Sequence, residues 1–234
     1  MTVNVVKVFS VASGLASVSR YSMIALGRRE SVLEHLGMVS LTANLLATQC
    51  NLIYSNCVDA GWVALKASVH DIDELVTGDI PRPTKYYNKD TRDMFRVIEE
   101  RGVRKVTLEM CLVPELQAEV IQAHRQSKKE HSGAIVAVAD VMAVCYKVWE
   151  EVLVRGNMSM AEHAVNVEGQ LKFLRDDIHE TFVGHRIKAG EFLIAILNDC
   201  SELMVKAAAK RDAIHGAIKE EMINNSHAAR ENHA

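Results

Sequence analysis

The apolar residues of this chain recur mostly at helical spacing, and the pattern predicts a series of α-helices joined by short polar segments. Residues 3–16 place valine, phenylalanine and leucine on one face, and after Ser31 an apolar stripe follows at positions 32, 36, 39, 43 and 46. The expected fold class is therefore all-α. Further helices are predicted over 60–71, 89–110, 134–145, 158–183 and 188–221, with another that begins at Pro114.

Local signals indicate how the helices begin and how the chain is organised. Ser31 followed by Glu34 is a capping-box pattern, which predicts a helix start. No repeat, low-complexity tract or interdomain linker is present, which indicates one domain. Residues 1–155 are expected to form its core and 156–225 a helical C-terminal extension packed on that core, whereas the polar residues 226–234 are expected to be a disordered tail.

Composition mainly excludes classes of function. Of the 234 residues, 49% are hydrophobic and only 5% aromatic, which favours helices over strands. The net charge of −3 offers no electrostatic basis for binding polymeric nucleic acid. The N-terminal residues lack the basic start and cleavage site of a signal peptide, and no apolar run is expected to span a membrane. Five cysteines without CxxC spacing indicate free thiols, so a cytoplasmic protein without a membrane partner is expected.

The segment from Val69 to Pro83 concentrates chemistry, because it holds one histidine and four acids. Adjacent His70 and Asp71 on a helix can both reach one divalent ion, as nitrogen and oxygen ligands. Glu74 would share their helical face and could handle the proton of a water beside the ion. Asp73 is expected to be a solvated charge. Alone, the segment fits an acidic, solvated helix end equally well.

Two residues elsewhere in the chain favour the metal site. His35 falls on the apolar stripe and points inward, a position more often occupied by a hydrogen-bonded core histidine. Asp140 interrupts an apolar helix, where a carboxylate must be paired or bound to a cation, and the nearest candidate partner is Lys147. Together with His70 and Asp71, these residues predict a four-ligand site. Two imidazoles and two carboxylates suit a Co, Mn, Zn or Fe ion.

This order of ligands resembles the HD-domain metallophosphohydrolases, and most of all the bacterial 5'-deoxynucleotidases of the YfbR type. The similarity spans roughly residues 18–155. It is carried by Ser19-Arg20-Tyr21, by 29–35, by 70–86 with its Thr-Gly-Asp-Ile-Pro-Arg-Pro-Thr-Lys-Tyr run, and by 139–142 with 147–151. The resemblance implies an HD-domain helical bundle that binds a divalent transition metal ion. Family members commonly have tryptophan where this chain has Tyr21.

The resemblance also implies roles for the remaining site residues. Arg20 and Lys85 would neutralise the phosphate, as their charges suggest. The aromatic ring of Tyr21 would lie against the sugar, and the segment from Thr77 to Lys85 would face the nucleotide. Asp79 would either protonate the leaving ester oxygen or hold the 3'-hydroxyl. Family members are homo-oligomers, so a homodimer is the default expectation.

Three functions remain open at this point. The first is a 5'-deoxynucleotidase acting on deoxynucleoside monophosphates, and the second is a triphosphohydrolase, including a dATP-selective one, that releases tripolyphosphate. The third is a non-catalytic nucleotide-binding protein, which the presence of all four ligands and Glu74 disfavours. Arg28, Arg29 and Arg82 could serve a longer phosphate chain or be solvated surface. His163 is expected at the surface or at a helix end.

Overall fold

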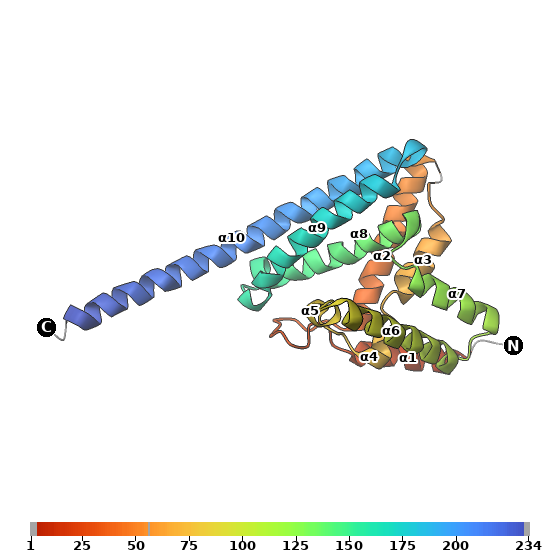
Figure 1. Ribbon diagram of the computed structural model, residues 1–234, viewed down its shortest axis with the longest axis horizontal. Helices are drawn as coiled ribbons and strands as arrows, with labels where there is room; N and C mark the ends of the chain where they lie inside the picture. The colour runs from red at the N-terminus through yellow and green to blue at the C-terminus, as the bar shows by residue number, and fades with distance from the viewer. Residues whose placement is uncertain (1–3, 56, 232–234) are drawn as a thin grey trace.

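The computed structural model describes residues 4–55 and 57–231, and these residues form α-helices with no strand among them (Figure 1). The predicted all-α fold class is confirmed. The α-helices are α1 (Val5–Ser17), α2 (Val32–Tyr54), α3 (Ala60–Val69), α4 (Glu74–Thr77), α5 (Arg82–Lys85), α6 (Lys89–Glu109), α7 (Pro114–Arg125), α8 (Glu130–Trp149), α9 (Ala161–Thr181) and α10 (Ile187–Glu231). A π-helix, η1 (Glu150–Val154), follows α8, and short 3-10 helices are η2 (Met158–Met160) and η3 (Gly184–Arg186).

Several helix starts follow the signals in the sequence. At α2 the Ser31 hydroxyl accepts from the Glu34 amide at 3.2 Å, and the Glu34 carboxylate accepts from the Ser31 amide at 2.7 Å. This is the predicted capping box. The Asp59 carboxylate caps α3, and Pro114 is the first residue of α7, where its missing amide hydrogen leaves no helical bond unmade.

The structure corrects two predicted boundaries. The helix expected to run through His70 and Asp71 ends at Val69, so these residues lie in the turn between α3 and α4. The turn keeps near-helical angles at His70 (φ −63°, ψ −28°), and the two side chains therefore stay close together. The tail predicted to be disordered is helical as far as Glu231, because alanine, arginine and glutamate favour the continuation of α10. Residues 232–234 lie outside the described residues.

Two hydrophobic cores hold the helices together. The larger core joins α2, α3, α8, α9 and α10, and the smaller core joins α1, α6 and α7 to the start of α2 and the end of α3. Helix α9 runs antiparallel to α8, and α10 runs antiparallel to α9 (Figure 1). Leu171 on α9 and Leu193 on α10 are fully buried in the larger core. The C-terminal segment is thus packed on the core, whereas the boundary at residue 155 remains a prediction. All five cysteines are free, as predicted.

The two cores meet at α2, and this junction positions the site. Val32 belongs to the smaller core and Val39 to the larger, with His35 between them. His70 follows Val69 of the smaller core, and Asp140 follows a core residue of α8. Residues far apart in sequence are therefore brought to one place by apolar packing.

Two core helices have the length and composition of a membrane span, a test that the buried core helices of folded proteins also pass. They are Val32–Tyr54 and the continuous helix Glu130–Val154. Of their apolar windows, 33% and 67%, respectively, are buried inside the protein. Both helices contribute residues to the larger core.

Candidate active site

Four predicted ligands converge at the junction of the two cores. The Nε2 atoms of His35 and His70 are 3.3 Å apart, and Asp71 Oδ2 lies 3.6 Å from the first and 3.2 Å from the second. Asp140 Oδ1 lies 3.2 Å from His35 Nε2. Both histidines are almost fully buried. Two nitrogen and two oxygen donors therefore face one small space.

The spacing of these donors fits a metal ion. Ligand atoms that each lie about 2.0 to 2.2 Å from a zinc-like ion lie roughly 3 to 4 Å from one another. The donor atoms of His35, His70 and Asp71 all lie within 4.8 Å of one another, and Asp140 adds the fourth. His70 Nδ1 lies 2.8 Å from the carbonyl oxygen of Ala67, and this contact favours a proton on Nδ1 and a free lone pair on Nε2. The residues present therefore fit a divalent transition metal ion.

Asp140 is paired differently from the sequence expectation. Its partner is Lys128, whose ammonium contacts Asp140 Oδ2, and not Lys147. The Lys147 side chain instead points to Glu150 and Glu151 at the far end of α8. Burial disfavours the charged carboxylate, but Lys128 and the hydrogen bond with His35 outweigh it and hold the pKa of Asp140 well below its usual range. Asp140 is thus held in its charged form, and its two oxygens face different groups, His35 and Lys128.

Glu74 is the least satisfied acid of the site. Its Oε2 atom is buried and has no hydrogen-bond partner among the described residues. Burial, followed by the negative charges of Asp71 and Asp79, raises the pKa of Glu74 to about 10. A carboxyl group that is buried beside a ligand cluster and holds its proton tightly is typical of a residue that handles protons.

Arg20 lies on the other side of His35. Its Nη1 donates to Glu30 Oε1 at 2.9 Å and also contacts His35 Nδ1. Arg20 Nε and Glu30 Oε2 are both buried without a partner among the described residues. The guanidinium therefore has a buried donor, Nε, that no group of the described residues accepts from.

A hydrogen bond links the backbone amide of Tyr21 to the side chain of Asp79. Tyr21 has a positive φ of 53°, and its amide donates to Asp79 Oδ2 at 2.6 Å. The Arg20 guanidinium carbon lies 5.0 Å from the centroid of the Tyr21 ring. Asp79 thus fixes the turn that carries Arg20 and Tyr21. This contact was not predicted, since the sequence suggested only that Asp79 protonates the leaving oxygen or binds the 3'-hydroxyl.

Two residues were missed or misjudged from the sequence. His163 lies in the first turn of α9, as one of its two predicted positions has it, but its ring is also edge-on to Tyr21 with centroids 5.8 Å apart, which the sequence did not indicate. His163 Nδ1 and the Tyr21 hydroxyl are buried and unpartnered among the described residues. Asp73, predicted to be solvated, is 5% exposed and lies 2.8 Å from His124 Nε2, because α7 packs over the turn. Their contacts depend on the tertiary packing of α7 and α9, which the local sequence does not show.

Other predicted substrate residues have partners within the protein. The Lys85 ammonium pairs with Glu99 on α6, and the Thr77 hydroxyl lies 3.0 Å from the carbonyl oxygen of Gly78. Arg28 donates to Glu150 and Arg29 to Ser19. Their substrate-binding roles remain predictions.

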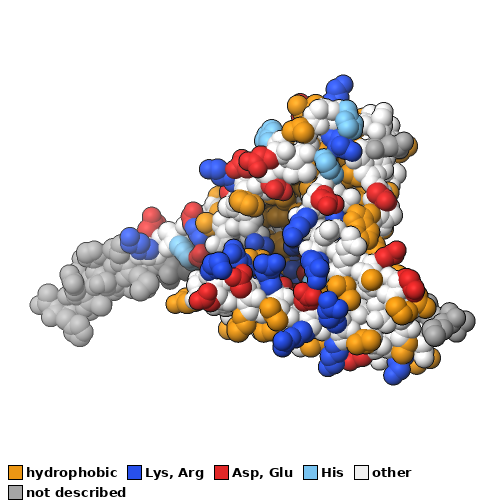
Figure 2. Space-filling model, turned by 45° about the vertical axis from the view of Figure 1, so that its right-hand side comes forward, with side chains coloured by type: hydrophobic (Ala, Val, Ile, Leu, Met, Phe, Trp, Pro, Cys, Tyr) orange, Lys and Arg blue, Asp and Glu red, His pale blue; other side chains and the backbone are white. Residues whose placement is uncertain are grey.

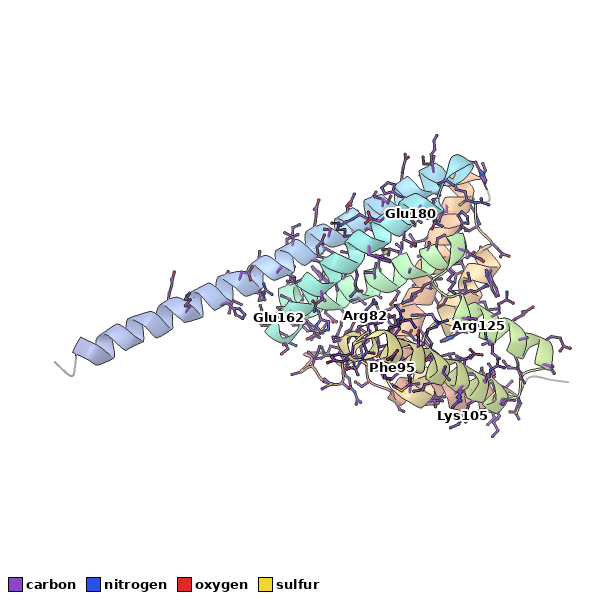
Figure 3. All side chains as sticks on the ribbon, viewed as in Figure 1. Arg82, Phe95, Lys105, Arg125, Glu162 and Glu180 are labelled. Atoms are coloured by element: carbon purple, nitrogen blue, oxygen red, sulfur yellow. The ribbon has the colours of Figure 1, made fainter. Side chains whose placement is uncertain are left out.

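Basic side chains also gather on one face of the molecule. Lysine and arginine side chains surround a hollow in the face shown in Figure 2. Arg82 lies on the side of α5 that faces α8, close enough to Lys128 for the two charges to repel (Figure 3). Arg82 also stacks on Tyr86, with its guanidinium carbon 5.2 Å from the ring centroid.

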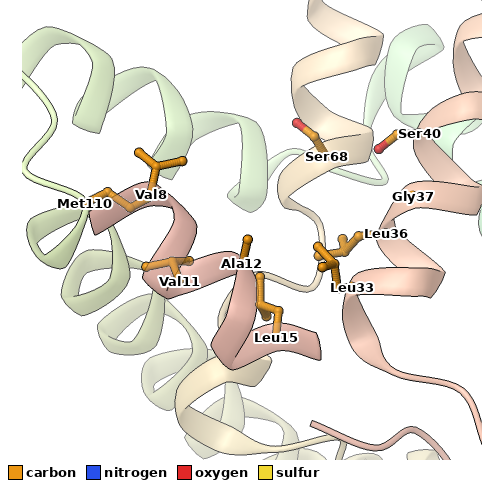
Figure 4. A pocket seen from close by; sticks show the side chains of 10 residues that line it. All are labelled: Val8, Val11, Ala12, Leu15, Leu33, Leu36, Gly37, Ser40, Ser68 and Met110. Atoms are coloured by element: carbon orange, nitrogen blue, oxygen red, sulfur yellow. The ribbon is translucent and has the colours of Figure 1, made fainter. Parts of the chain in front are cut away.

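A separate apolar cavity of about 400 Å³ lies between α1 and α2 (Figure 4). Its walls include Val11, Leu36 and Met110, and none of the four predicted ligands lines it. It is therefore distinct from the metal site.

Comparison with known proteins agrees with this geometry. Residues 7–190 match the family described as 5'-deoxynucleotidase YfbR-like. The chain belongs to this family. The 5'-deoxynucleotidase YfbR of Escherichia coli (strain K12 / DH10B) is 31% identical over 179 residues, which cover 75% of this chain and 87% of the relative. The resemblance inferred from the sequence is thereby confirmed.

Solved structures show the same fold at lower identity. An HD-domain phosphohydrolase from Listeria innocua is 21% identical with a TM-score of 0.67, and the match covers 88% of this chain and 99% of the other. The HD phosphohydrolase of cyanophage S-2L, solved with dA and one catalytic Zn2+ ion bound, is 14% identical with a TM-score of 0.58 and coverage of 82% and 95%. The YfbR-like chain thus has an HD-domain helical fold.

Proposed function

We propose that this chain is a metal-dependent 5'-deoxynucleotidase that hydrolyses the 5'-phosphate ester of deoxynucleoside monophosphates. The observation that carries the proposal is the convergence of two imidazoles and two carboxylates beside the unpartnered carboxyl group of Glu74. The name of the Escherichia coli relatives supports the substrate class. The cyanophage protein, which binds dA and zinc, supports a nucleoside beside a metal.

The ligands would be His35, His70, Asp71 and Asp140. A bound divalent ion would polarise a phosphate oxygen and lower the pKa of a nearby water. We assign to Glu74 the acceptance of the proton of the attacking water; the negative charge of Asp71 helps to raise its pKa, and a cation bound at the ligands would offset that effect.

The substrate would be held by groups on both sides of the ligands. The free Nε donor of Arg20 is suited to a phosphate oxygen, and the Tyr21 ring is suited to the flat face of the sugar. Asp79 Oδ2 is committed to the Tyr21 amide. Its other oxygen would protonate the leaving oxygen or bind the 3'-hydroxyl.

One observation keeps the triphosphohydrolase alternative open. Arg82 and Lys128 place two cations at the site, whereas Arg28 and Arg29 are paired with other residues. Two such cations would suit a phosphate chain longer than a single phosphoryl group. This alternative would release tripolyphosphate.

Product identification tests both functions. Purified protein with Mn, Co, Zn or Fe would be given dAMP, dATP and AMP, and phosphate and tripolyphosphate would be quantified separately. Phosphate from dAMP supports the proposal, and tripolyphosphate from dATP supports the alternative. If neither appears with any of the metals, the non-catalytic alternative becomes the better explanation. Turnover of AMP at the rate of dAMP would mean that Tyr21 does not select the deoxy sugar.

The class of metal ion and the oligomeric state are also part of the proposal. The mixed nitrogen and oxygen donors favour Co, Mn, Zn or Fe, and metal analysis of the protein as purified would identify the ion. A homodimer is proposed, supported by exposed leucines on α2, of which Leu41 and Leu45 are 64% and 63% exposed. Light scattering during gel filtration would test it. A cytoplasmic location remains a prediction.

A further inference from the structure

The turn between α7 and α8 carries a lysine that no motif in the sequence marks. The Lys128 ammonium contacts Asp140 Oδ2, and the Lys128 side chain is 43% exposed while that of Asp140 is 15% exposed. Asp140 is the only hydrogen-bond acceptor of this ammonium among the described residues. An ammonium group has three donors, so two remain available at the open side of the site.

Two contacts fix the position of this turn. Lys66 is fully buried on α3, four residues before His70, and its Nζ donates to the carbonyl oxygen of Lys129 at 3.0 Å. Gly133 lies under the turn, where a Cβ would be 2.7 Å from the carbonyl carbon of Lys128. Any larger residue would push the turn away. The turn is therefore tied to the helix that leads into the ligands, and Lys128 is held at the site.

The two carboxylate oxygens of Asp140 face different groups. Oδ1 lies 3.2 Å from His35 Nε2, on the side of the ligand cluster, and Oδ2 faces Lys128. A carboxylate can bind an ion through one oxygen and keep a hydrogen bond on the other. The Lys128 ammonium would then keep its contact with Oδ2 while Oδ1 faces the ligand cluster.

The surrounding charges fit an anion there. Arg82 lies near Lys128, and two cations on one side of a site attract a phosphate dianion in common. Lys85, to which the family resemblance assigned the phosphate, is paired with Glu99.

We infer that Lys128 binds a phosphate oxygen of the substrate and that the turn held by Lys66 and Gly133 positions it for this contact. The inference rests on the proposed function for the identity of the substrate. It does not require turnover, because inorganic phosphate, the product, carries the same oxygens.

Calorimetric titration with inorganic phosphate tests this at saturating Mn2+. Lys128→Met is expected to weaken phosphate binding about 10- to 100-fold, which is the range for loss of one charge-assisted hydrogen bond. Lys128→Arg should restore binding to within a few-fold of wild type. Lys129→Met, on the same turn, removes a charge without touching the site and should bind phosphate as wild type does. The affinity for Mn2+, titrated in parallel, should not fall in Lys128→Met.

The outcomes separate the roles of Lys128. Phosphate binding by Lys128→Met at wild-type strength would overturn the inference and leave the lysine as a counterion of Asp140. Equal weakening in Lys129→Met, or no phosphate binding by the wild-type protein, would overturn it too. If wild type binds phosphate through Lys128 but releases none from dAMP, the proposed function fails and the lysine contact stands. If dAMP is hydrolysed and Lys128→Met keeps its KM for dAMP, the proposed function stands and the assignment of the phosphate contact to Lys128 fails.

Discussion

Two clusters of buried charge lie along α8, one around Asp140 near its middle and one around Lys147 in its last turn, and they differ in how fully the protein satisfies them. At the C-terminal end, Lys147 Nζ donates to Glu151 at 2.8 Å, to Glu150 at 3.2 Å and to the carbonyl oxygen of Arg28 at 2.6 Å. The Glu151 carboxylate also accepts from the backbone amide of Gly27. None of these polar side-chain atoms is buried without a partner.

The cluster around Asp140 is incomplete by comparison. Glu74 Oε2, Glu30 Oε2 and Arg20 Nε are buried and unpartnered among the described residues. Most buried polar groups in proteins are hydrogen-bonded, and exceptions gather where a ligand completes the set. The Lys147 cluster therefore holds the loop before α2 in place, whereas the unpartnered atoms of the Asp140 cluster fit the proposed metal ion and phosphate.

Removal of a ligand should give the largest contrast. We expect His70→Ala to lose bound metal and nucleotide hydrolysis together, because only three of the four donors remain. One of these three, Asp71, lies in the same turn as the substituted residue. Metal analysis and phosphate release from dAMP measure both. Lys147→Met, which alters the satisfied cluster, should keep its metal. Full metal content in His70→Ala would mean that the ion binds elsewhere.

Glu74→Gln should separate catalysis from metal binding. The amide matches the shape of the carboxyl group but cannot carry the proton, so kcat should fall about 10²- to 10⁴-fold. Metal content and KM should change little, because Glu74 is not counted among the ligands. An unchanged kcat would reassign the proton transfer, with Asp79 as the next candidate.

The convergence of His35, His70, Asp71 and Asp140 could be predicted because each residue is marked within its own helix or turn. A carboxylate inside the apolar run of α8 and a histidine on the apolar stripe of α2 are visible from spacing alone, and the adjacent His70 and Asp71 have the donor types that a transition metal prefers. The helices themselves follow from the same periodicity, with Ser31 and Pro114 at their starts.

The partners of these residues could not be predicted, since they depend on tertiary packing. Lys128 reaches Asp140 across 12 positions through the shape of a turn that Gly133 permits. His163 meets Tyr21 only because α9 folds back along α8. Lys85 was assigned to the phosphate by similarity, and the packing of α5 on α6 gives it Glu99 instead.

The satisfied cluster should affect stability and not chemistry. Lys147→Met leaves the buried carboxylate of Glu151 without its cation, and the free energy of unfolding should fall by about 3 to 5 kcal/mol. Urea unfolding measures this loss, and Lys172→Met, at an exposed position of α9, is the matched control. If both variants unfold alike, the cluster contributes little, and the contrast with the metal site is weaker than its geometry suggests.

The smallest effect should be a pH dependence of stability through Glu151. Burial alone would raise its pKa, but hydrogen bonds from Lys147, Asn157 and the backbone amides before α2 lower the pKa from 4.5 to about 2. Because the folded pKa is the lower one, the stabilisation is complete above about pH 4.5 and is lost as pH falls toward 2.

The difference in unfolding free energy between wild type and Glu151→Gln should therefore shrink by about 2 kcal/mol between about pH 6 and pH 3. Urea unfolding of both proteins at each pH measures it, and the subtraction removes the titration of other carboxylates. A difference that stays constant would mean that Glu151 stabilises by neutral hydrogen bonds. The Lys147 and Asp140 clusters would then differ in how many partners their polar atoms have, and not in how their charges are balanced.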